Sequence, residues 1–122
     1  MALTAAGKNF AARSYVNENV YIALATAASD SNELVGHGYS RSTWASGQKT
    51  LNTTTTTITN SADLTVYTAN DDAAQDATHV ALFDAATGGN RLNDWTAITM
   101  DISAPTNGQS VVIRTGQISF DL

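Results

Sequence analysis

The 122-residue sequence contains no cysteine, only one proline and few charged residues. Without cysteine the chain can form neither a disulfide nor a thiolate metal site, so its stability must come from packing and backbone hydrogen bonds. Lys and Arg number 6 against 11 Asp and Glu, and the net charge at pH 7 is −5. Because a nucleic-acid partner requires a face rich in Lys and Arg, we expect no such partner.

Long apolar runs are also missing. No stretch approaches the roughly 20 residues that a membrane-spanning helix needs, and the start lacks the basic and then apolar pattern of a secretory signal peptide. We therefore expect a soluble protein without a membrane partner. The length predicts a single domain over residues 1–122, large enough to bury one core.

Residues that carry chemistry are scarce. His37 and His79 are the only histidines, and each fits a structural role better than that of a metal ligand or base. Asp71, Asp72 and Asp76 lie in one polar segment that could hold Ca²⁺, but the alternating oxygen ligands and closing Glu of a calcium loop are absent. No nucleophile elbow or phosphate-binding glycine loop occurs. We expect no catalytic residue, no cofactor and no metal.

What the chain does contain is a repeated pattern. Residues 21–34 align without a gap with residues 79–92, so that Leu24 matches Leu82. Each copy reads as a strand, a turn of small residues and a second strand. Such units favour a fold built from two similar halves, although two independently arising hairpins would give the same pattern.

The turns of the two copies are the candidate functional residues. Both are rich in Ser, Asp, Asn, Thr or Gly, which form turns readily. We predict that they contact another protein; the alternative is that they are ordinary turns facing solvent. The residues are Ser29, Asp30, Ser31, Asn32, Thr87, Gly88, Gly89 and Asn90.

The start of the chain predicts a short helix over residues 3–13. Thr4 suits the N-cap position, and Leu3, Ala6 and Phe10 recur at helical spacing. A helix of this length is marginal alone and has to dock on something. It would serve as a lid over one end of a sandwich or as an arm that reaches a neighbouring subunit, and we favour the lid.

The remainder predicts about eight short strands separated by turns. Short strands without intervening helices indicate an all-β fold, a single antiparallel β-sandwich behind an N-terminal helical segment over residues 1–15. The pattern fits a jelly-roll-like and an immunoglobulin-like arrangement equally well. One long strand is expected over 92–102. The predicted core is Ile22, Leu24, Leu34, Trp44, Leu64, Val66, Val80, Leu82, Leu92, Ile98, Val112 and Ile118.

The threonine tract over residues 53–57 predicts an outer or edge strand, because threonine is β-branched and favours extended backbone. An edge strand without charges or proline invites pairing with another chain. We therefore expect self-association into a homo-oligomer, with Thr53, Thr55 and Thr57 as edge contacts.

Three aromatic residues offer an alternative function. Trp44, Trp95 and Tyr39 could form a stacking platform for sugars if their rings are exposed on one surface. Buried tryptophans are commoner in small sandwiches, so solvent exposure decides between a glycan-binding module and a scaffold.

Several segments of the chain together resemble a known family. They include His79–Leu92 and the segment Glu33–Arg41, which is similar to a Glu-x-x-Gly-Gly-Gly-Tyr-x-Arg motif with His37 in place of a glycine. The other matching segments are Met1–Asn9, Val20–Ala27, Asn60–Ala62 and Ile113–Leu122. The chain resembles small structural proteins of tailed-bacteriophage virions, of the tail-fibre or head-decoration type.

The resemblance implies a non-enzymatic virion protein that is assembled in the host cytoplasm. It would decorate the capsid or form a fibre base or fibre module, binding its own copies and a larger virion protein, either the major capsid or a tail protein. The compact domain favours the capsid slightly, because no shaft or coiled-coil segment is present. The alternative is a receptor-recognition module that binds a host surface glycan.

Overall fold

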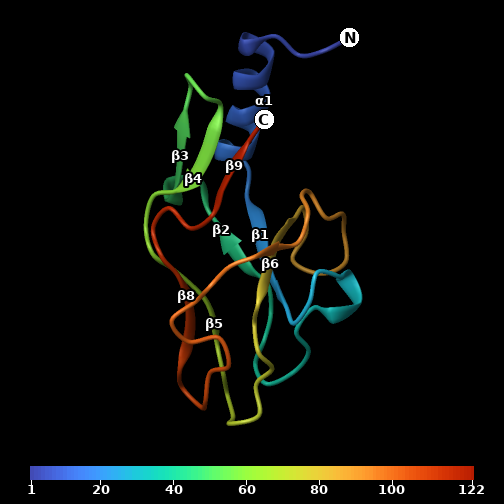
Figure 1. Ribbon diagram of the computed structural model, residues 1–122, viewed down its shortest axis with the longest axis vertical. Coiled ribbons are helices and arrows are strands. Elements are labelled where there is room, and N and C mark those ends of the chain that lie inside the picture. The colour runs from blue at the N-terminus through green and yellow to red at the C-terminus, as the bar shows by residue number, and fades with distance from the viewer.

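A computed structural model describes residues 1–122 as one helix followed by nine short antiparallel strands (Figure 1). The sheets are not closed, and the predicted all-β sandwich with an N-terminal helix is confirmed. The elements are α1 (Ala5–Asn17), β1 (Val20–Ala25), the 3₁₀ turn η1 (Asp30–Asn32), β2 (Ser42–Trp44), η2 (Ser46–Gln48), β3 (Lys49–Asn52), β4 (Thr57–Asn60), β5 (Leu64–Thr68), β6 (His79–Phe83), β7 (Thr96–Ala97), β8 (Ser110–Ile113) and β9 (Ser119–Asp121).

The strands form three sheets. The largest has the order β2-β1-β6-β7, the second the order β3-β4-β9, and β5 pairs with β8. α1 and the β3–β4 hairpin lie at one end of the long axis, and the loop between β5 and β6 lies at the other end (Figure 1). α1 is neither long nor apolar enough to cross a bilayer.

β1 and β6 are buried on both faces, as their apolar runs predict. On one face Ile22 and Leu24 join the main core. On the other face alanines and Phe83 pack with Trp95 in a smaller cluster. The two repeat turns directly follow these strands in the chain.

Most of the predicted core is confirmed. Leu24 and Leu82, which align in the repeat, are 0% and 1% exposed. Leu92 and Ile98 are half-buried and pack against the outside of the main core, so for them the prediction is confirmed only in part. The other confirmed residues are Ile22, Leu34, Trp44, Leu64, Val66, Val80 and Ile118.

The prediction that Val112 is a core residue is wrong, because the inward-facing positions of its strand are shifted by one residue relative to the prediction. Leu64 pairs with Ile113, while Val112 pairs with the exposed Thr65. Residues directly opposite each other in a sheet share a face, so Ile113 points inward and Val112 outward. Val111 and Ile113 are both 0% exposed.

α1 is a helix as predicted, but it docks through another face. The Thr4 side chain accepts the backbone N–H of Gly7 at 3.1 Å, which confirms the N-cap. The helix packs through Ala12 and the Tyr15 ring, and the latter meets the ring of Phe120 edge-on. The predicted docking residues Leu3 and Phe10, with Ala6, face solvent instead.

A buried lysine fastens the end of the helix. The Lys49 ammonium donates to the carbonyls of Tyr15 (2.7 Å) and Glu18 (2.6 Å). It thereby satisfies carbonyls that the end of a helix leaves without partners. Burial lowers the pKa of Lys49 to about 8.

The threonine tract is a turn and not an edge strand. Thr53–Thr56 connect β3 to β4, and Thr57 lies in β4, the central strand of its sheet. Asn52 Oδ1 accepts the backbone N–H of Thr54 at 3.0 Å and so starts the turn. The edge-strand basis for self-association at this tract is therefore wrong, while contact through its exposed threonines stays a prediction.

Two other segments of the chain are mostly irregular. The strand expected over 92–102 is reduced to the two residues of β7. Residues before β2 cannot extend, because Gly36, His37 and Gly38 all have positive φ. The left-handed conformation of His37, at φ 58°, suits the glycine found at this place in the resembling motif.

Candidate functional site

The two copies of the repeat are neighbours in the structure. β1 pairs with β6, and the aligned residues Ala23 and Ala81 lie opposite each other. Ile22 pairs with Leu82, and correspondingly Leu24 pairs with Val80. This register relates the two copies by an approximate local two-fold axis between Ala23 and Ala81.

The turns are closed by equivalent hydrogen bonds. In the first copy, the backbone N–H of Thr26 donates to the Asn32 carbonyl at 3.0 Å. In the second, the N–H of Asp84 donates to the Asn90 carbonyl at 3.1 Å. The bridges Ala25–Glu33 and Phe83–Arg91 follow the same correspondence. The repeat is therefore structural as well as sequential. We name residues 26–33 and 84–91 the paired turns.

The two turns reach the same outline by different chemistry. In the first, the Ser29 hydroxyl accepts the N–H of Ser31 at 3.3 Å and caps η1. In the second, the Asp84 carboxylate accepts the backbone N–H of Asn90 at 2.7 Å. Gly89 has φ 72°, and a Cβ there would meet Asp84 Oδ1 and lie 2.7 Å from the Ala85 Cβ.

Arg41 joins the paired turns. Its guanidinium donates two hydrogen bonds of 2.9 Å to the Glu33 carboxylate, one to each oxygen. The same group donates to the carbonyls of Ala85 (2.9 Å) and Gly88 (2.7 Å), and it stacks 3.7 Å over the Phe83 ring. Only 8% of the Arg41 side chain is exposed, so the charge is held in place between the turns.

Asp30 makes the second link. Its Oδ1 accepts hydrogen bonds from Arg91 Nε at 2.9 Å and from Trp95 Nε1 at 2.7 Å. These bonds hold the first turn against the residue that ends the second. The hydrogen bond from Trp95 is the main cause that lowers the pKa of Asp30, and Arg91 adds to it.

Glu33 stays ionised for a related reason. Burial alone would raise its pKa, but hydrogen bonds from Arg41 and Tyr39 outweigh burial and hold the pKa below its usual value. The Tyr39 hydroxyl donates to Glu33 at 2.7 Å and accepts the backbone N–H of Leu24 at 3.1 Å. Glu33, Tyr39 and Arg41 thus form one network across the base of the first turn.

The structure brings together all eight turn residues predicted from sequence. All of them are exposed except Ser29, which is half-buried. The sequence prediction missed Glu33, Tyr39 and Arg41 as the residues that fix the turns. A signal for them was available, because the segment Glu33–Arg41 carries these three residues as the outer positions of the family-like motif.

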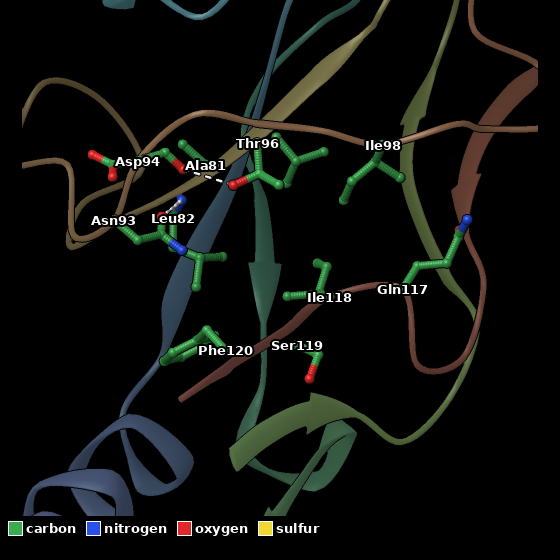
Figure 2. Close-up of a pocket in the computed structure, with 11 residues that line it drawn as sticks. Ala81, Leu82, Asn93, Asp94, Thr96, Ile98, Gln117, Ile118, Ser119 and Phe120 are labelled. Carbon is green, nitrogen blue, oxygen red and sulfur yellow. Dashed lines mark hydrogen bonds between the residues drawn. The ribbon is translucent and has the colours of Figure 1, made fainter. Parts of the chain in front are cut away.

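A separate cavity of about 160 Å³ lies between β6, β7 and the segment that leads into β9 (Figure 2). Val80, Leu82, Ile98 and Phe120 supply apolar walls. Asp94 is its only titratable group, and that carboxylate is open to solvent. The cavity therefore pairs this carboxylate with no second titratable group. The Leu82 N–H that faces it is already bonded to the Asn93 side chain at 2.9 Å.

The other candidate sites have structural roles. Trp44 is 0% and Trp95 is 8% exposed, so these two rings offer no sugar-stacking platform. His37 pairs with Asp71 at 2.9 Å. No group of three His, Asp or Glu side chains is arranged to hold a metal.

Comparison with known proteins gives the class of this protein. A family model described as "Podophage GP4 fiber I protein gp80" matches residues 3–121. The resemblance to structural proteins of phage virions is therefore confirmed, and the chain is a phage structural protein. In particular, it belongs to the gp80 fibre I protein family. No curated protein and no solved structure matches the chain.

Proposed function

We propose that this protein is a module of a phage fibre or fibre base that binds its own copies and a larger virion protein. The observation that carries the proposal is membership of a fibre-protein family over residues 3–121. The same membership favours a place on the fibre over a place on the capsid. Capsid decoration had been favoured only by the compact shape of the domain.

The paired turns are the proposed contact with the larger virion protein. Their tips are polar and exposed, while Arg41 and Asp30 hold them in a fixed relative position. A surface that is already ordered loses little conformational entropy on binding. Many copies of one modest contact also give durable attachment to a repeated partner.

Substitution at the turn tips tests this contact. Asn32→Arg and Thr87→Arg place bulk on the two turns, and neither side chain makes an internal hydrogen bond. We expect both variants to fold normally but to be depleted from purified particles, as measured by quantitative mass spectrometry. Thr65→Arg, on the exposed side of β5, is the control and should be incorporated normally. Normal incorporation of both turn variants would exclude the paired turns as the contact.

The location is tested by cryo-electron microscopy of intact particles, with a tagged copy of the chain to identify its density. We expect the density on a fibre or at its base. Density on the head shell alone would overturn the fibre proposal and favour capsid decoration.

A further inference from the structure

The sandwich is open along β9, an edge strand with one side unpaired. β9 pairs only with β4, in the sheet of order β3-β4-β9. The Asn60 N–H donates to the Ile118 carbonyl at 3.1 Å, and bonded and non-bonded residue pairs alternate along an antiparallel ladder. The backbone N–H and C=O groups of Ser119 and Asp121 therefore point away from β4, and no other group of the chain bonds to them.

The cavity of about 160 Å³ lies directly beside this free edge (Figure 2). Ile118 and Phe120 form one wall with side chains that turn inward from the end of the chain, and Ile98 lies across from them. An apolar cavity of this size can hold a hydrocarbon group as large as benzene. The open side therefore combines unpaired backbone with room for one apolar side chain. An added β-strand uses both features, because backbone bonds give affinity and pockets for alternate side chains give specificity.

The segment before α1, residues 1–4, has the pattern of a strand that fits this edge. It is not helical, and Thr4 has extended backbone at φ −73° and ψ 170°. Met1 and Leu3 alternate with the small Ala2, and the Leu3 side chain is 60% exposed. Alternate residues of an extended segment lie on the same face. This segment therefore presents an apolar face that its own chain leaves in solvent.

We propose that residues 1–4 of one copy add as a strand to the β9 edge of a second copy, with the Leu3 side chain in the cavity. Every strand pair within the chain is antiparallel. In that orientation Ala2, placed opposite Ser119, exchanges backbone hydrogen bonds with both of its free groups. Leu3 then lies opposite Ile118 and shares its inward face. This contact rests on the proposed function and deepens it, because it names the segment and the edge through which copies bind.

The segment cannot reach the cavity of its own chain. Asn9 Nδ2 donates to the Thr53 carbonyl at 3.2 Å, at the turn between β3 and β4. Thr4 lies more than one helical turn before Asn9, about 7 Å further along the helix axis, and the N-terminus projects beyond this end of α1, away from the sheets (Figure 1). Ser119 pairs with Thr59, which lies roughly 10 Å from the turn in the opposite direction along β4. The strand that fills the edge must therefore come from another molecule.

Two substitutions in the full chain test the two sides of the contact. Leu3→Ser removes the apolar side chain that fills the cavity, and Ser119→Pro removes the free N–H of the edge. Proline is tolerated on an edge strand where the missing N–H faces solvent, so pairing with β4 should be kept. Sedimentation velocity over a concentration series gives the association constant of each variant. We expect each constant to be at least about tenfold lower than that of the unmodified chain.

Matched controls keep this test specific. Val35→Ser removes another exposed apolar side chain, which is 72% exposed and lies outside the proposed contact, and Ser119→Ala keeps the backbone N–H. Both controls should associate like the unmodified chain. If thermal unfolding shows that Ser119→Pro is not folded, Asp121→Pro replaces it, because the Asp121 N–H also points away from β4.

Disulfide trapping tests the pairing itself. The chain contains no cysteine, so Ala2→Cys and Ser119→Cys can be introduced in separate copies and mixed. Both positions are exposed, and in the proposed pair they lie directly opposite each other, close enough for a disulfide. Oxidation should give a dimer that contains one copy of each variant, identified by mass spectrometry. Ala2→Cys mixed with Thr65→Cys, which is exposed on β5, should not be trapped.

Three outcomes would overturn the proposal. The unmodified chain could stay monomeric at every concentration, Leu3→Ser and Ser119→Pro could associate normally, or Ala2→Cys could fail to link to Ser119→Cys. A monomeric chain would leave an extended segment of the larger virion protein as the strand that fills the edge. Each outcome is separable from the location test. A chain that lies on the fibre but stays monomeric refutes only the strand exchange, and a chain that associates through residues 1–4 but lies on the head shell refutes only the fibre.

Discussion

At the scale of single residues, Arg41 has the most contacts that depend on its chemistry. A guanidinium can donate to both oxygens of a carboxylate and to carbonyls beside it, whereas an ammonium acts as a point charge. Arg41 uses this fork to bind Glu33 and two carbonyls of the second turn. One side chain therefore couples two turns that are far apart in sequence.

Replacing Arg41 should be costly. Arg41→Ala leaves the half-buried Glu33 carboxylate and two turn carbonyls without their donor, and we expect the free energy of unfolding to fall by about 2–4 kcal/mol. Arg41→Lys keeps the charge but not the fork, so about half of that loss should remain. Urea unfolding followed by tryptophan fluorescence measures both. Equal stability of Arg41→Lys and the unmodified chain would show that charge alone suffices.

The same network predicts acid sensitivity. Because the folded-state pKa of Glu33 lies below its usual 4.5, its contribution to stability is complete above about pH 5 and is lost as the pH falls through the folded-state pKa. Glu33→Gln should therefore lower the free energy of unfolding at pH 7. The difference from the unmodified chain should shrink below about pH 4 and vanish at lower pH. Two unfolding curves that stay parallel across this range would contradict the assignment.

Sequence could predict most inward residues but not the phase of every strand. Where polar and apolar residues alternate, as at Leu64 and Val66, the pattern marks the buried face. In Val111-Val112-Ile113 every side chain is apolar, so the phase is set only by pairing with β5. A bulge between Thr65 and Tyr67 shifts that pairing, and no local signal announces it.

At the scale of elements, the second turn depends on a single glycine conformation. Gly88 and Gly89 both have positive φ, but only at Gly89 would a Cβ meet other atoms. Gly88→Ala should therefore cost about 1 kcal/mol, from the left-handed backbone alone. Gly89→Ala adds overlap with Asp84 and Ala85 and should cost about 2–4 kcal/mol. Paired urea titrations measure the difference, and equal losses would mean that the turn yields to the added methyl.

Element boundaries were predicted well where local chemistry dictates them and poorly where it does not. Thr4 starts α1 because its hydroxyl can cap the helix. Thr53–Thr57 has strand propensity throughout, yet the chain reverses there, since the Asn52 side chain supports a turn and β3 and β4 pair on both sides. Pairing in the whole sheet overrides propensity in such a tract.

At the scale of the whole molecule, the two repeat copies are related by local two-fold symmetry, but the two ends of the long axis differ from each other. The eight turn residues were predictable because the copies align in sequence. Their coupling was not, since Arg41 lies outside the repeat and reaches carbonyls more than 40 positions away. Nor did periodicity indicate which helix side docks: Leu3, Ala6 and Phe10 form an apolar stripe, but the helix packs through Ala12, Tyr15 and Val16.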